Sequence, residues 1–146
     1  MASSTSARAG GVRYRSLARL ALLAALAAAP AAADSCWWHN GSLMRLQASG
    51  DWRSFSYENP RDVLRSAGVR PGTVLFEGRK VGEWYTGTAR IFSRYCPDDP
   101  YEYAVEGPVG AGPTVTVEGW RETFHQCAPD GGSKRDRLVF TYAHDC

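Results

Sequence analysis

The sequence lacks the residue patterns that mark familiar catalytic sites. It has no Gly-x-Ser-x-Gly segment that would present a nucleophilic serine, and no glycine-rich loop that would hold a phosphate group. It also has no Cys-x-x-Cys pair, which excludes the spacing of thioredoxin-like redox sites and of zinc ribbons. These absences lead us to expect a protein that is not an enzyme and that carries no cofactor.

Concentrated positive charge is lacking as well. Beyond the first 33 residues, the densest basic segment is Lys134-Arg135-Asp136-Arg137, and an aspartate already interrupts it. Proteins that bind nucleic acid gain affinity from clustered lysine and arginine, which displace counterions from the phosphates. We therefore expect no nucleic-acid partner, and we interpret this segment as a solvated turn.

The first thirty-three residues have the composition of a secretory signal peptide. Four arginines form a basic leader, and an apolar run from Leu20 to Ala29 then leads to a small-residue cleavage pattern, Ala31-Ala32-Ala33. This run is shorter than the roughly 20 residues that a helix needs to cross a bilayer, so cleavage is favoured over a membrane anchor. The mature chain, residues 34–146, then holds 13 basic and 15 acidic residues, a net charge of −2.

All four cysteines follow the predicted cleavage site. The alanine-rich leader and the preference for arginine over lysine are typical of bacterial exported proteins, which predicts a periplasmic or secreted location. Both locations are oxidising, so disulfides are expected, and a nucleophilic cysteine is not. Four cysteines allow three pairings. If the first and last strands are neighbours, Cys36 pairs with Cys146, and Cys96 then pairs with Cys127.

The mature chain has the length and the patterning of one all-β domain, which we place at residues 34–146. Removing 33 of the 146 residues leaves 113, enough for a single hydrophobic core. Short stretches of alternating polar and apolar residues, separated by glycine, proline and aspartate, predict antiparallel strands. Eight candidate strands cover residues 43–47, 52–57, 73–77, 81–85, 88–94, 101–106, 114–121 and 137–142.

The connections between these strands follow from glycine and proline. Residues 48–51 predict a hairpin loop, and residues 78–80 and 86–87 predict turns. Residues 62–67 have room for one or two helical turns that end at Gly68. Five prolines fall between the predicted strands, at positions 97, 100, 108, 113 and 129.

Eight short strands can form a small up-and-down β-barrel or a two-sheet sandwich. Tight turns between successive strands favour the barrel, and closure also removes the exposed sheet edges that a secreted all-β protein would have to protect. We therefore expect a small antiparallel barrel that two disulfides hold together.

Aromatic residues supply the ligand-binding candidates. Most of them are expected in the core, because one buried aromatic side chain removes roughly 150–250 Å² from water. Some can instead line a barrel mouth or an exposed face and bind an apolar or sugar ligand. We select Trp52, Trp84 and Tyr85 for this role, with Arg61 and Arg65 as anion contacts.

The histidines and the Asp98-Asp99 pair carry no recognisable site. The three histidines, His39, His125 and His144, show neither the helical nor the alternating spacing of a metal site. Asp98 and Asp99 lie between two prolines, which favours a turn over a calcium site. We expect no bound metal, although a hydrolase that uses His125 or His144 remains an alternative.

Four segments spread over the mature chain are distinctive: Trp38-His39-Asn40-Gly41-Ser42, Tyr57-Glu58-Asn59-Pro60-Arg61, Gly72-Thr73-Val74-Leu75-Phe76-Glu77-Gly78 and Tyr85-Thr86-Gly87-Thr88-Ala89. Together they resemble a group of small secreted alphaproteobacterial proteins of unknown function. The resemblance implies bacterial export, and it conveys no activity and no site residues.

The sequence therefore favours an exported, non-enzymatic β-barrel module that binds a small ligand or a component of the cell envelope. The alternative is an inhibitor that acts on an envelope enzyme through the loop at residues 60–72. The identity of the partner and the oligomeric state are left open.

Overall fold

The computed structural model describes residues 1, 3–5, 33–110 and 112–146. The predicted signal peptide, residues 1–33, lies almost wholly outside the described residues. Among the residues that are described, no helix has both the length and the apolar character to span a membrane.

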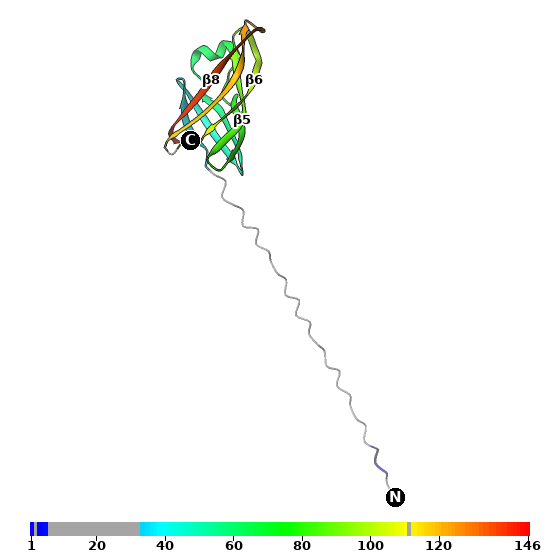
Figure 1. Ribbon diagram of the computed structural model, residues 1–146. Coiled ribbons are helices and arrows are strands. Elements are labelled where there is room, and N and C mark those ends of the chain that lie inside the picture. Colours follow the sequence, from blue (N-terminus) through cyan, green and yellow to red (C-terminus); the bar gives the residue numbers. More distant parts are fainter. Residues whose placement is uncertain (2, 6–32, 111) are drawn as a thin grey trace.

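Within residues 33–110 and 112–146, eight antiparallel strands follow one another around a closed barrel (Figure 1). The last strand pairs with the first, so the barrel predicted from the sequence is confirmed. The strands are β1 (Ser35–His39), β2 (Ser42–Ser49), β3 (Trp52–Asn59), β4 (Val74–Val81), β5 (Trp84–Ser93), β6 (Cys96–Pro108), β7 (Thr114–His125) and β8 (Ala128–Asp145).

The predicted number of strands is right, but two errors cancel in it. Strand β1 was not predicted, and the three strands predicted between residues 73 and 94 are in fact two, β4 and β5. The sequence predicts turns at Gly78 and Gly87, whereas these two glycines pair with each other in the middle of this hairpin. A Cβ atom on either glycine would overlap the backbone of the opposite strand. These glycines therefore allow two strands to approach closely, and the turn lies instead at residues 82–83.

The prediction that prolines lie only in connections is wrong. Pro113 does lie between strands, but β6 contains Pro97, Pro100 and Pro108, and β8 contains Pro129. The register of β6 with β5 shifts between Ile91 and Ser93, which leaves residues 97–100 without partners on β5. A proline costs no ladder hydrogen bond in such an irregular stretch. Residue 98 has a φ of 63° there.

The basic segment at residues 134–137 is not a turn. It lies within β8 and pairs with residues 118–121 of β7. Its side chains alternate between the two faces of the barrel wall, so the basic charge is divided between them. Arg135 and Arg137 are exposed on the outer face.

Stacked aromatic rings fill the barrel interior. The rings of Phe55 and Phe140 lie parallel, with their centroids 3.9 Å apart, and Phe76 packs at a tilt against Phe55. All three phenylalanines are almost fully buried, together with Met44. Burying a side chain of this size contributes about 1.5–3 kcal/mol, so these residues form a packed hydrophobic core inside the barrel.

A short 3₁₀ helix, η1 (Asp62–Ala67), covers one end of the barrel. It ends where predicted, because Gly68 adopts a φ of 83° at its C-cap, a left-handed conformation that suits glycine. Ala67, the last residue of η1, and Val69, just after it, are buried. The loop between β3 and β4 is therefore built into the core on one side and exposed on the other.

Both predicted disulfides are present among the described residues. Cys36 of β1 joins Cys146 beyond β8, and Cys96 at the start of β6 joins Cys127 in the turn before β8. The bonds lie at opposite ends of the barrel. Disulfides persist in oxidising compartments, so the pair fits an extracellular or other oxidising location.

Candidate functional site

The tryptophans of this protein lie mainly on its surface. All five are among the described residues, and four of them are at least 39% exposed. These four are outward-facing residues of alternate strands: Trp38 on β1, Trp52 on β3, Trp84 on β5 and Trp120 on β7. The expectation that aromatics fill the core therefore holds for Phe55, Phe76 and Phe140 but not for most of the tryptophans. Exposed aromatic side chains of this kind are candidates for contacts with a ligand or a partner.

The strand register aligns polar residues between these tryptophans. One row runs across the outer face and takes one residue from each of six strands, β3 to β8: Trp52, Arg79, Thr86, Glu106, Glu118 and Arg137. Trp84 lies two residues before the row on β5, and Trp120 lies two residues after it on β7. Because β5 and β7 run in the same direction, the two indoles lie on opposite sides of the row.

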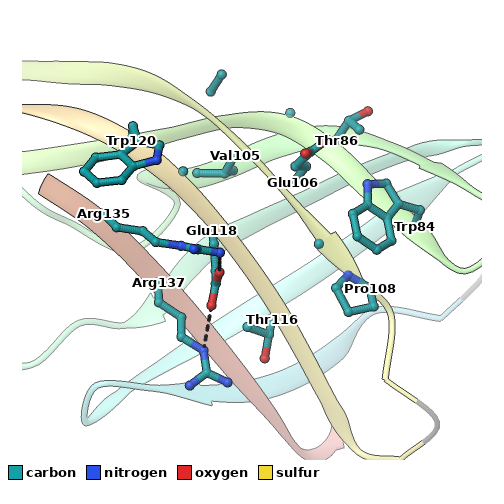
Figure 2. A pocket seen from close by; sticks show the side chains of 14 residues that line it. Trp84, Thr86, Val105, Glu106, Pro108, Thr116, Glu118, Trp120, Arg135 and Arg137 are labelled. Atoms are coloured by element: carbon teal, nitrogen blue, oxygen red, sulfur yellow. Dashed lines mark hydrogen bonds and ion pairs between the residues drawn. The ribbon is translucent and has the colours of Figure 1, made fainter.

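A groove of about 850 Å³ occupies this part of the outer face. Figure 2 shows Trp84 and Trp120 at opposite sides of it, with Glu118 between them. Thr86, Glu106, Thr116, Arg135 and Arg137 complete the polar lining. All of these side chains come from strands β5 to β8, so the barrel wall holds them in place.

Glycines explain why β6 and β7 meet so closely beneath the groove. A Cβ atom on Gly107 of β6 would overlap the carbonyl oxygen of Thr116, and one on Gly119 of β7 would overlap that of Ala104. Only glycine fits at such positions. Both glycines line the groove, so its floor is partly bare backbone.

The junction of β6 and β7 also has the fewest paired residues of the junctions in the described barrel. In the described part of the chain, the ladder between them pairs Glu106 with Glu118, and an isolated bridge joins Val109 to Val115. The neighbouring ladders between β5 and β6 and between β7 and β8 each extend over many more residue pairs. The groove thus follows the junction at which adjacent strands of the described barrel have the fewest paired residues.

The charges in the groove balance. Arg135 donates to one oxygen of Glu118, and Arg137 Nε lies 3.2 Å from the other. Glu106 forms no ion pair with any described residue, so two carboxylates face two guanidinium groups. Exposed ion pairs of this kind contribute at most about 1 kcal/mol to stability. They bring the hydrogen-bonding groups of Glu118, Arg135 and Arg137 together on the outer face.

The structure separates the residues that the sequence selected for binding. Trp84 lines the groove, and Trp52 lies at the far end of the same outer row. Tyr85 is only 3% exposed and packs near Phe76 inside the barrel, where burial raises the pKa of its hydroxyl.

Arg61 and Arg65 belong to the η1 loop, whereas Trp84 begins β5 at the opposite end of the barrel. Arg65 pairs there with Asp62, at 3.3 Å. The two arginines therefore lie at the opposite end of the barrel from Trp52 and Trp84, the tryptophans with which the sequence grouped them.

Sequence reasoning missed most of the groove, including Trp120, Glu106, Glu118, Arg135 and Arg137. One signal was available in the sequence: Thr116, Glu118 and Trp120 alternate with Val115 and Val117 along the predicted strand. Successive side chains of a strand point to opposite faces, so if the valines face the core, Trp120 faces outward.

The histidines lie in three separate places. His125 ends β7 and His144 lies near the end of β8, so these two exposed residues are at opposite ends of the barrel. His39 is 8% exposed and stacks on Phe140, with Nδ1 2.9 Å from the carbonyl oxygen of Val139. Burial lowers the pKa of His39.

Among the described residues, no group of three or more His, Cys, Asp or Glu side chains has an arrangement that would hold a metal ion. The groove contains carboxylates from two adjacent strands, but Glu118 already forms ion pairs with two arginines. What the arrangement offers chemically is therefore a set of hydrogen-bond donors and acceptors between two flat apolar surfaces. No family model, curated protein or solved structure matches this chain.

Proposed function

We propose that this chain is an exported, non-enzymatic binding module that holds its ligand in the groove between Trp84 and Trp120. The observation that carries the proposal is the exposure of these two indoles, 45% and 68%, on either side of a fixed polar row. Ligand sites in proteins commonly combine aromatic surfaces with a few placed polar groups. The two disulfides support export, because they require an oxidising compartment to form and persist.

Rigidity also supports a binding role. Strands position side chains more precisely than loops do, so a ligand bound here orders few protein groups. The polar groups of the groove are held by neighbouring strands and by the contacts of Glu118 with Arg135 and Arg137. A binding role requires the groove and its hydrogen-bonding groups, and it requires no catalytic residue.

The test is a thermal-shift screen of the mature protein against sugars, peptidoglycan fragments, peptides, lipids and metals. A ligand that binds only the native state raises its melting temperature. We expect a hit whose shift disappears in both Trp84→Ala and Trp120→Ala. Trp38→Ala is the matched control, because Trp38 is 52% exposed but lies on β1, outside the groove. A hit that keeps its full shift in both groove variants would contradict the proposal.

A second candidate function is inhibition of an envelope enzyme through the loop at residues 60–72. One observation favours it: Val63 is 67% exposed on a loop whose base is fixed. The base is held by hydrogen bonds from Gly72 N to Tyr57 O and from Tyr57 N to Thr73 O, at 2.7 and 2.9 Å. If alanine substitutions at residues 62–65 left partner binding unchanged, this candidate would be rejected.

A further inference from the structure

The spacing of the two groove tryptophans limits the size of the ligand. Trp84 and Trp120 lie two strands apart. Thr86 and Glu118 lie in one row across the strands, Trp84 is two residues to one side of that row, and Trp120 is two residues to the other side, so the tryptophans are four residues apart along the strand direction. With strands about 4.8 Å apart and a rise of about 3.4 Å per residue, the two positions are roughly 17 Å apart along the wall. A ligand that contacts both indoles must be elongated.

The indoles also indicate what kind of surface the ligand has. An exposed indole offers a flat apolar face together with one N–H donor at its edge. Pyranose rings match this surface, because one ring face presents C–H groups while the hydroxyls point outward from the rim. Two indoles on opposite sides of a polar row therefore suit a chain of sugar rings, with a ring stacked at each side.

The polar row between the indoles suits hydroxyl groups. Glu106 and Glu118 are acceptors, and Arg135 and Arg137 keep most of their five N–H donors free after contacting Glu118. Two carboxylates and two guanidinium groups give the lining no net charge. An anionic polymer would meet the carboxylates and a cationic one the guanidinium groups, so a neutral ligand fits best.

The pairing of β1 with β8 leaves the described barrel no free outer strand for a peptide to extend the sheet, and at the sparsely paired junction of β6 and β7 such a peptide would have to displace the Glu106–Glu118 pair. Such a peptide pairs with an exposed sheet edge, and the barrel in the described residues is closed. The groove lies on the outside of the barrel, between Trp84 and Trp120.

From these features we infer that the groove binds an uncharged glycan chain of several sugar rings, an inference that rests on the proposed function. Stacking on Trp84 and Trp120 provides the apolar contacts. The row that contains Glu106 and Glu118 binds the hydroxyls of the rings between them.

The experiment is a fluorescence titration of the mature, disulfide-bonded protein with β-1,4-linked glucose and N-acetylglucosamine oligomers of increasing length. We expect tryptophan quenching by at least one series, with affinity rising at least about tenfold from the monosaccharide to the longer oligomers. We expect Trp84→Ala and Trp120→Ala each to lower the affinity about tenfold, since each removes one stacking surface. Trp38→Ala should bind as the unmodified protein does, and added salt should leave the affinity unchanged.

Three results would overturn the inference: no binding of either series, affinity independent of length, or binding unaffected in both groove variants. Parallel titrations with acidic oligosaccharides, short peptides and lipid vesicles distinguish failure of the glycan inference from failure of the proposed function. If one of those ligands binds and depends on Trp84 and Trp120, the groove is a binding site but the glycan is wrong. If no ligand depends on these tryptophans, both proposals are wrong.

Discussion

Removing the disulfide between Cys36 and Cys146 should destabilise the barrel more than removing the one between Cys96 and Cys127. The cysteines are 110 residues apart in the first pair and 31 in the second. If a disulfide acts by restricting the unfolded chain, loops of these lengths correspond to about 4.8 and about 3.7 kcal/mol. While the inner bond is intact it shortens the outer loop by 31 residues, which lowers the first value to about 4.5 kcal/mol.

The native structure supports assigning this effect to the unfolded state. Near the outer disulfide, β1 and β8 are already paired through Trp37 with Tyr142 and through Trp38 with Thr141. Cys146 N also donates to Asp34 O, at 3.0 Å. The strands therefore stay together in the folded protein without the sulfur bridge, and the loss appears as greater freedom of the unfolded chain.

The assay is equilibrium urea unfolding of the double variants C36A/C146A and C96A/C127A, followed by tryptophan fluorescence. Because the outer bond lowers the value of the inner one by the same amount, to about 3.4 kcal/mol, we expect the first variant to lose about 1 kcal/mol more than the second. Both should show a larger m value, because an uncrosslinked chain exposes more surface on unfolding. Far-ultraviolet circular dichroism controls for loss of the fold. A larger loss in C96A/C127A, or m values equal to that of the unmodified protein, would refute the loop argument.

Three further substitutions test the close strand approach, the buried histidine and the interior ion pair. Gly119→Ala should cost about 1–3 kcal/mol in urea unfolding, because its Cβ would overlap a carbonyl oxygen of β6. Gly112→Ala, with open space around it, should cost less than about 0.5 kcal/mol, and equal costs would contradict this reading. Because burial lowers the pKa of His39, the unfolded state binds more protons below pH 6.5, so stability should fall as the pH drops below that value. His39→Gln should remove this dependence, and an unchanged slope would rule His39 out as its source. Asp136→Asn should cost about 1–3 kcal/mol at neutral pH, because it weakens the contact of Arg121 Nε, at 2.9 Å, with the carboxylate; a cost near zero would show that the pair is dispensable.

The sequence predicted the barrel and both disulfides but misplaced several strand boundaries. Strand β1 was missed because residues 35–39 are few and contain two adjacent tryptophans, which break the alternation. Gly78 and Gly87 were read as turns, since glycine is common both in turns and where two strands approach closely. Local composition does not separate these two uses. The difference becomes visible only when the partner strand is known.

The candidate site was predicted only in part, for a related reason. Trp84, which the sequence suggests as a ligand-binding residue, is exposed and lines the groove, but the residues that accompany it come from β6, β7 and β8. Their alignment depends on the register between strands, and a shift of one residue would turn Glu118 and Trp120 inward. The register depends on how the whole barrel closes, which the sequence alone does not reveal. For the same reason the sequence did not show that Arg61 and Arg65 lie at the opposite end of the barrel from Trp84.

The bond between Cys36 and Cys146 makes the polypeptide between them a covalent macrocycle, with a smaller cycle closed inside it by Cys96 and Cys127. A protease that cuts one exposed turn, such as residues 82–83, would open the backbone without releasing a fragment. The nicked molecule would keep its strands tethered beside one another and would come apart only after reduction. A single cleavage event therefore need not inactivate this protein.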